Sequence, residues 1–353
     1  MKRAQPTRRR WIAALVAPVV AAAGCGGSTT AASSDARSAD PTTVPEVELL
    51  DYRSLDGSDN NPDDADLGQA GSAYPRVADA NYADGVGEAR SGPPERYLSN
   101  RIFNDTNQNV FSENSVTHWS FVWGQFVDHT IGLREVSDED LTIAFDPDDP
   151  LETFTNDLGS ISTTRSAAAD GTGVESTREQ VNTVSSYIDA WAVYGGSEER
   201  LDWLRDGIVD GDPTNNDATL VEVEGYLPTA SARVDAEAPE TDLMGRLFAD
   251  PSPAVVAGDV RVNENIGLTA VHTLFLREHN RIVDALPDDL DEETKFQIAR
   301  RVVSALQQYI TNEEFLPAIG VDLDRYDGYD VDVDPSIPNE FATVGYPDHS
   351  QIN

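Results

Sequence analysis

Cysteine is almost absent from this sequence, which holds 353 residues and the single cysteine Cys25. A disulfide needs two cysteines, so the fold depends on its hydrophobic core, on bound cofactors, or on both. Lysine occurs only at Lys2 and Lys295, and 63 acidic residues stand against 25 basic ones, for a formal charge of −38. Such an acidic chain repels phosphate groups, which argues against nucleic acid as a partner.

Long apolar runs are also absent from the chain after its N-terminal segment. No apolar run there approaches the about 18 residues that a membrane span needs. Residues 1–25 combine a basic start, an apolar stretch and small residues before Cys25, which is typical of an export signal. The segment TRRRW is typical of a twin-arginine signal, and AAGC resembles a lipobox with Cys25 as the acylated residue. We expect an exported protein, lipid-anchored to the outer face of the cytoplasmic membrane. An ordinary signal peptide cut nearby is the alternative.

The remaining chain divides into a tether and one domain. Residues 26–46 are small, polar and non-periodic, as in a flexible tether, and residues 47–353 form the domain. Its first part, to Pro94, is irregular and rich in Gly, Asp, Asn and Pro, and alternating strand patterns are scarce. The fold class predicted is mainly α with long irregular connections. Apolar spacing predicts helices from Asn114 or Ser115 to about Ile131, and over 180–194, 198–205, 267–286 and 292–310.

Two short segments carry the chemistry. In FVWGQFVDHTI, residues 121–131, the side chains of Gln125, Asp128 and His129 share one helical face. Buried polar groups need partners, and a core histidine with a local carboxylate would also explain this pattern. In GDVRVNEN, residues 258–265, Arg261 and Glu264 are three apart, which taken alone is a surface ion pair.

Together the two segments resemble the animal-type haem peroxidase superfamily, in its bacterial branch. The signature WGQFxDH matches residues 123–129 throughout, and Arg-x-x-Glu followed by HTLFLREHNR matches residues 261–281. Weaker matches keep the family's order: YRSLDGSDNN at 52–61, YADG at 82–85, REQVN at 178–182, SSYIDAWAVYG at 185–195, EEFLPAIG at 313–320 and IPNEFATVGY at 337–346. The resemblance implies a helical haem b peroxidase that reduces hydrogen peroxide and oxidises small organic donors or halides.

The resemblance also implies a role for each matched residue. His129 corresponds to the distal acid–base catalyst, and Arg261 to the cation that stabilises charge on the breaking O–O bond. Gln125 corresponds to the amide that orders distal water or a halide. Asp128 and Glu264 correspond to carboxylates that form ester bonds with haem methyl groups.

The proximal iron ligand implied by the family follows an NEFAT-like segment, which makes His349 the match. Pro347-Asp348 stands where the family usually carries an arginine for a haem propionate, and the sequence ends at Asn353, before the family's following helices. We therefore expect a domain that is incomplete at its C-terminus. The alternatives are a partner that supplies the missing part, or a protein that no longer holds haem well. Asn265 replaces a haem-linking methionine of some members, so no sulfonium link is expected. The other histidines are expected to be structural: His118, His272 and His279.

A calcium site is also implied by the family. The matching positions are Thr130, Ser185, the Tyr187 carbonyl and Asp189, while Trp191 replaces a hydroxyl ligand. Calcium takes six to eight oxygen ligands, usually with several carboxylates, and this set offers one. Both retention and loss of the ion stay open.

Two alternative functions remain. Tyr346 stands three residues before His349, as does the radical-forming tyrosine of the fatty-acid dioxygenases of this superfamily. The same tyrosine also fits the aromatic packing residue that peroxidases carry nearby. The second alternative is a non-catalytic surface binding module on a decayed peroxidase scaffold.

Overall fold

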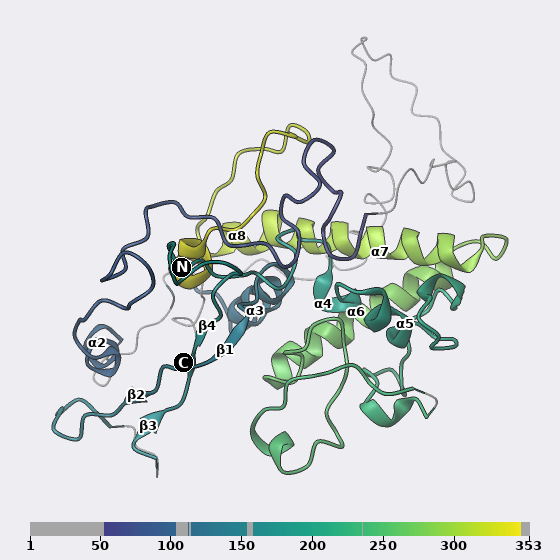
Figure 1. Ribbon diagram of the computed structural model, residues 1–353. Coiled ribbons are helices and arrows are strands. Elements are labelled where there is room, and N and C mark those ends of the chain that lie inside the picture. Colours follow the sequence, from purple (N-terminus) through teal and green to yellow (C-terminus); the bar gives the residue numbers. More distant parts are fainter. Residues whose placement is uncertain (1–52, 104–111, 113, 154–157, 235, 347–353) are drawn as a thin grey trace, which may run out of the picture. The chain divides into compact units, whose positions relative to one another are not determined.

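A computed structural model describes residues 53–103, 112, 114–153, 158–234 and 236–346 (Figure 1). The chain separates into two units at Tyr52, and all described residues belong to the second, Arg53–Asn353. Cys25 and His349 lie outside the described residues, as does the predicted export signal. No helix among the described residues has the length and apolar character needed to cross a membrane.

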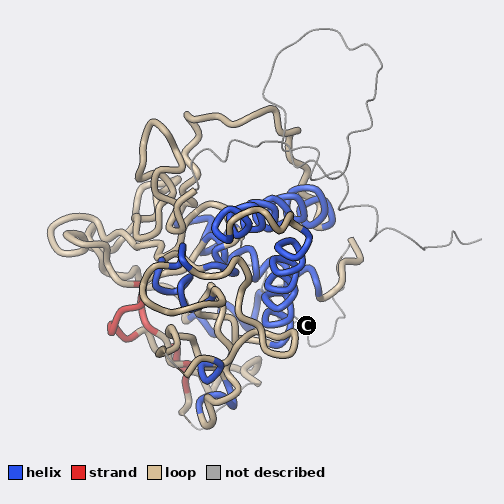
Figure 2. Tube along the Cα trace, turned by 90° about the vertical axis from the view of Figure 1, so that its right-hand side faces the viewer, coloured by secondary structure: helices blue, strands red, loops and turns tan. Residues whose placement is uncertain are grey.

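Helices make up most of the regular structure, which confirms the predicted mainly α fold class. Three of them build the centre: α3 (Trp119–Ile131), α6 (Ile266–Ala285) and α7 (Glu292–Tyr309). Helix α6 contacts both α3 and α7. In Figure 2 the helices gather together while loops run around them. Shorter helices are α2 (Glu95–Ile102), α4 (Trp191–Tyr194), α5 (Glu198–Leu204) and α8 (Leu316–Ala318).

Helices α6 and α7 follow the sequence prediction closely because both carry side-chain caps. The Asn265 side chain accepts a hydrogen bond from the Leu268 amide, and Asp291 does the same for Thr294. Acidic residues in the first turn of α7 also suit the positive end of the helix dipole. Helix α7 continues into the π-helical turn η4 (Ile310–Phe315). The short helix predicted at 198–205 is confirmed as α5.

Two helix predictions are wrong in extent. Ser115 has a φ of 56°, in the left-handed region, so it cannot cap α3, which begins at Trp119. The helix predicted over 180–194 is present only as α4. The residues before α4 form bridges, with Val181 opposite Ala73 and Asn182 opposite Arg134. The Asn182 side chain bonds backbone groups of other segments, which favours irregular structure over a helix.

Strands are few and short in the described part of the chain, as predicted. Strand β1 (Val136–Asp140) pairs with β4 (Thr164–Ser166), and β2 (Ile143–Ala144) pairs with β3 (Ser160–Ile161), both antiparallel. Single turns of 3₁₀ or π helix complete the structure: η1 (Pro213–Asn215), η2 (Ala230–Ala232), η3 (Gly245–Phe248) and η5 (Phe341–Gly345).

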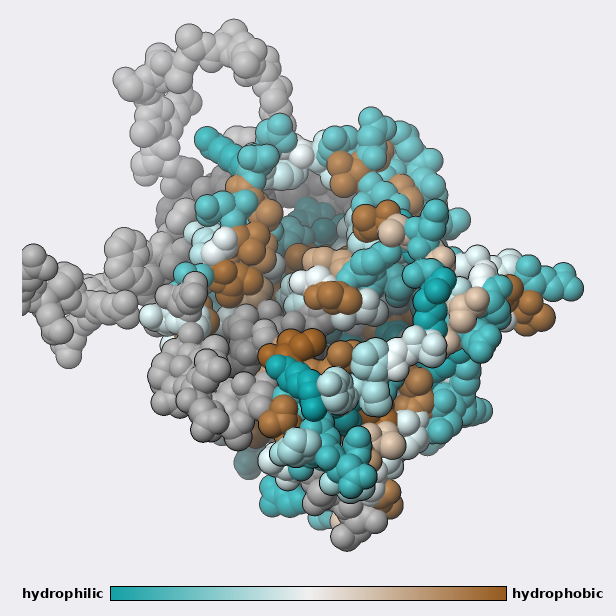
Figure 3. Space-filling model, turned by 90° about the vertical axis from the view of Figure 1, so that its left-hand side faces the viewer, coloured by the Kyte–Doolittle hydropathy of each residue, from teal (hydrophilic) through white to brown (hydrophobic). Residues whose placement is uncertain are grey.

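The core lies where α3 packs on α6. Phe126 of α3 is fully buried and stacks on Phe275 of α6, with ring centroids 5.3 Å apart. His272 meets the Phe126 ring edge-on at 5.0 Å. Each such buried aromatic contributes about 1.5–3 kcal/mol relative to exposure, so this contact fixes α3 firmly against α6. On the side of the molecule shown in Figure 3, hydrophilic residues are interleaved with hydrophobic ones at the surface.

Candidate haem-peroxidase site

Helix α3 carries one half of the candidate site. Gln125 and His129 are one turn apart on this helix, and His129 is only 4% exposed. Burial against the apolar core, with the Arg261 charge adding to it, holds the pKa of His129 well below 6.5. The imidazole is therefore neutral at neutral pH and able to accept a proton.

The segment before α6 carries the other half. The Gln125 Nε2 group donates to Glu264 Oε2 at 2.6 Å, and Asn265 Nδ2 donates to Gln125 Oε1 at 2.7 Å. His129 Nε2 lies 3.6 Å from the same Glu264 oxygen. The structure thus brings together Gln125, His129 and Glu264 from the two sequence motifs. Partial burial raises the pKa of Glu264, and the nearby Asp259 charge acts in the same direction.

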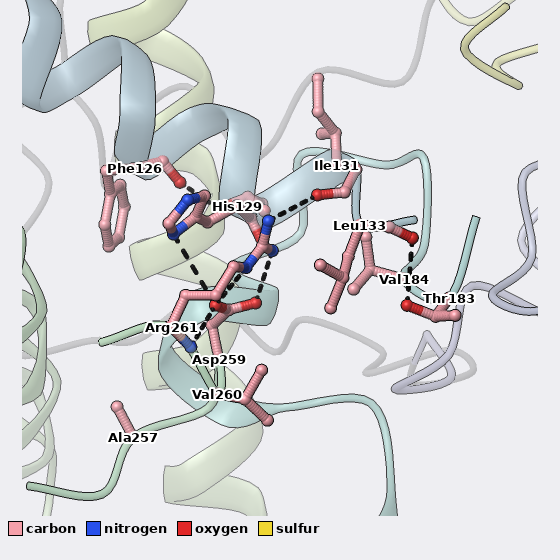
Figure 4. A network of polar contacts seen from close by, with 12 residues as sticks. Phe126, His129, Ile131, Leu133, Thr183, Val184, Ala257, Asp259, Val260 and Arg261 are labelled. Atoms are coloured by element: carbon pink, nitrogen blue, oxygen red, sulfur yellow. Dashed lines mark hydrogen bonds and ion pairs between the residues drawn. The ribbon is translucent and has the colours of Figure 1, made fainter. Parts of the chain in front are cut away.

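Arg261 is buried beneath His129 rather than open to a ligand. Its Nε and Nη2 groups donate to the Asp259 carboxylate at 2.8 and 2.7 Å. Its Nη2 and Nη1 groups donate to the carbonyls of His129 and Gly132 at 3.1 and 2.9 Å (Figure 4). Burial alone would lower the pKa of Arg261, but Asp259 outweighs it and the pKa is raised. Four of the five donor hydrogens of the guanidinium are thereby in use.

The charge of Asp128 affects two other groups near the site, Tyr74 and Arg261. Burial, and next the Asp128 charge, raise the pKa of the Tyr74 hydroxyl to about 12. The Asp128 carboxylate also favours the charged form of Arg261. The predicted ester role of Asp128 stays a prediction.

The C-terminal described segment reaches α3 as well. The Tyr346 hydroxyl donates to the Gly124 carbonyl at 3.0 Å, one residue before Gln125. This contact brings the chain to within three residues of His349, which lies outside the described residues.

The distal residues fit a haem group. A buried imidazole whose Nδ1 has no hydrogen-bond partner, a carboxylate with 29% of its side chain exposed, and an amide face one region. Haem sites of this kind need a proton carrier and polar groups near the iron's open position. The set supplies both, and His349 is left as the predicted axial ligand.

The predicted calcium ligands do not fit the ion. Asp189 is paired with Arg53 and with Arg300, whose Nη2 donates to Asp189 Oδ2 at 3.0 Å. The Thr130 hydroxyl donates to the Phe126 carbonyl at 3.0 Å, and the Tyr187 carbonyl accepts from the Asp189 amide at 2.9 Å. The described residues contain no group of three or more His, Cys, Asp or Glu able to hold a metal ion. These contacts give the calcium prediction no support.

Two other histidines belong to the core, and two further residues belong to the site although the sequence did not predict them there. His272 and His279 are fully buried core residues, as expected, and the ring of His279 bonds the Tyr194 hydroxyl at 2.8 Å. Asp259 and Asn265 were missed as site residues. Asp259 carries a visible signal, since it lies two residues before Arg261 in the same motif, but no periodicity links it to His129.

One cavity of about 700 Å³ lies beside the site, lined in part by Trp191, Arg200 and Asp259. Gln125, His129 and Glu264 do not line it, so it meets the candidate site only at Asp259. We place no substrate in it.

Comparison with known proteins identifies the class. The profile of the animal haem peroxidase family matches residues 52–353. The chain therefore belongs to the animal haem peroxidase family, as its motifs predicted, and the family implies a haem cofactor. It is similar to the thyroid peroxidase of Sus scrofa, at 31% identity over 359 residues covering 87% of this chain and 38% of that protein.

Solved structures agree on the fold. Peroxidase A from Dictyostelium discoideum matches with a TM-score of 0.68 and 26% identity, over 84% of this chain and 58% of that chain. Fatty acid alpha-dioxygenase from Arabidopsis thaliana matches with a TM-score of 0.54 and 19% identity, over 76% of this chain and 37% of that one, which shows a shared fold alone. The chain thus spans less than two thirds of the length of each of these relatives.

Proposed function

We propose that the protein is an exported haem peroxidase that reduces hydrogen peroxide and oxidises small organic donors or halides. The observation that carries the proposal is the contact between its two motifs. Gln125 on α3 and Glu264 before α6 are 139 residues apart in sequence and share a hydrogen bond of 2.6 Å beside His129. A bound haem, held by His349 and linked through Asp128 and Glu264, would supply the redox chemistry.

Each distal residue has a defined task in this proposal. His129 takes a proton from the bound hydrogen peroxide and returns it to the departing oxygen, which a neutral imidazole can do. Gln125 holds a water or a halide on the same side. Arg261 contributes positive charge from beneath the helix, and its one remaining donor hydrogen limits direct contact with peroxide.

The test compares His129→Ala with His118→Ala in haem-loaded protein mixed rapidly with hydrogen peroxide. His118 lies just before α3 and is exposed, so its replacement is a matched control. His129→Ala should slow the peroxide-dependent change in haem absorbance by at least about 10²-fold, with haem still bound. Arg261→Ala should slow the same step, and the double variant should lose less than the sum. A haem-replete His129→Ala protein reacting at the wild-type rate would refute the assignment.

A second candidate is fatty-acid dioxygenation, favoured by one contact. The Tyr346 hydroxyl donates to the Gly124 carbonyl, so this tyrosine lies against the helix that carries Gln125 and His129. Oxygen uptake with a fatty acid, lost in Tyr346→Phe, would support this candidate over the peroxidase. A folded protein that takes up no haem would instead support the binding-module alternative.

A further inference from the structure

Asp259 lies between the two residues to which catalysis is assigned. Its side chain is 1% exposed, and its Oδ1 atom is 3.7 Å from His129 Nδ1. The same carboxylate accepts two hydrogen bonds from Arg261 and a third from the Arg261 backbone amide at 2.9 Å. Figure 4 shows Asp259 facing both the imidazole and the guanidinium.

The contact with His129 is electrostatic at this distance. A hydrogen bond from imidazole N–H to oxygen spans about 2.7–3.2 Å, so 3.7 Å exceeds it by about half an ångström or more. His129 Nδ1 has no hydrogen-bond partner although it is buried. An Nδ1 lone pair directed at a carboxylate is repelled, whereas an Nδ1–H is attracted, so the anion selects the tautomer.

The two carboxylates that flank the imidazole are unequal. Glu264 approaches Nε2 at 3.6 Å, but its side chain is 29% exposed and its charge is shared with Gln125. Asp259 is held as an anion, because Arg261 lowers its pKa despite the burial that would raise it. The other charged groups that face His129 are Arg261 and, when protonated, His272, and both oppose protonation of the ring.

We propose that Asp259 is a positioning residue that holds His129 in the tautomer with hydrogen on Nδ1, so that the Nε2 lone pair points toward Gln125 and Glu264. This inference rests on the proposed function for its purpose, because only Nε2 then accepts the peroxide proton. The arrangement is the one that a buried aspartate gives a catalytic histidine in serine proteases, where an asparagine in its place leaves the wrong tautomer.

The primary experiment needs no activity. The full chain is labelled with ¹⁵N-histidine, and its five histidines give few enough ring signals to assign His129 by comparison with His129→Asn. Wild-type protein at pH 7 should show His129 protonated on Nδ1. Protonation on Nε2 instead would overturn the proposal, whatever the variants do. Peroxidase activity and the tautomer are separate readouts, so the proposed function can fail while this inference stands.

The variants sharpen the test. In Asp259→Asn, the side-chain amide can donate to Nδ1, so the hydrogen should move to Nε2 and the peroxide step should slow by about 10²-fold or more. Asp242→Asn is the matched control, because Asp242 is an exposed carboxylate that acts on Asp259 and Glu264 only through space. The control should leave both readouts unchanged. A folded Asp259→Asn protein that keeps hydrogen on Nδ1 would overturn the proposal.

Discussion

Replacing Arg300 with methionine should destabilise the fold by about 3–5 kcal/mol, because Asp189 loses its buried guanidinium partner and two backbone carbonyls lose their donor. Arg300 of α7 is 5% exposed and donates to Asp189 at 3.0 Å. The same guanidinium donates to the carbonyls of Arg53 and Ser54 at 2.7 and 2.8 Å. After the change, Asp189 retains only Arg53, whose side chain is 42% exposed and whose compensation is therefore weak.

The magnitude follows from three lost contacts around one side chain. Each of the two carbonyl bonds contributes about 0.5–1.5 kcal/mol, and the rest comes from the weaker pairing of Asp189 with the exposed Arg53 alone. Methionine keeps an apolar stem, so lost packing adds little. At about 2 °C or more per kcal/mol, the melting temperature should fall by about 6 °C or more.

The assay is urea and thermal unfolding of wild type, Arg300→Met and Arg301→Met. Arg301 is the next residue on α7 and is exposed, so its change should stay within about 0.5 kcal/mol. A chelator should leave the wild-type melting temperature unchanged, because two guanidinium groups already neutralise Asp189. Equal stability of the two variants, or a chelator effect reversed by calcium, would refute this reasoning.

Three further predictions concern other parts of the chain. Burial lowers the pKa of His279 to about 4 in the folded state, whereas the unfolded state titrates near 6.5. As the pH falls from 6.5 to 4, only the unfolded state binds this proton, so the free energy of unfolding should fall by about 3 kcal/mol. His279→Gln should remove that slope in urea unfolding, and an unchanged slope would contradict the shift. Cys25→Ser should release the protein from membranes to the medium, whereas unaltered fractionation would rule out the lipid anchor. Peptides of peroxide-treated holoprotein should carry haem on Asp128 and Glu264 by mass spectrometry, and full release of unmodified haem by acidic solvent would speak against the esters.

Helices with their own start signals were predictable from the sequence. Asn265 and Asp291 cap α6 and α7 within a few residues, and the apolar spacing that follows is local information. The segment 180–194 was misread because its conformation is set from a distance. Asn182 is held by the backbone at the end of α3, and Asp189 by Arg300 of α7. Such contacts leave no periodic pattern in the sequence.

The candidate site was predictable from the sequence only where two of its residues lie in the same helix. Gln125 and His129 are one turn apart, so their shared face followed from helix geometry. The meeting of Gln125 with Glu264 followed only from the resemblance, and the structure supplies the contact. From the sequence, Asn265 stands out only as the replacement for a methionine, whereas in the structure its side chain both caps α6 and donates to the Gln125 side chain.

In the proposed function, the two carboxylates beside His129 give its proton transfer a defined direction. Arg261 keeps the pKa of Asp259 low, while burial raises the pKa of Glu264. Environments that push two neighbouring pKa values apart give the groups different tasks. Asp259 is then the permanent anion on the Nδ1 side, and Glu264 is the more basic carboxylate on the Nε2 side. In the proposed mechanism, the proton that His129 exchanges with a ligand passes through Nε2, where Gln125 and Glu264 also lie.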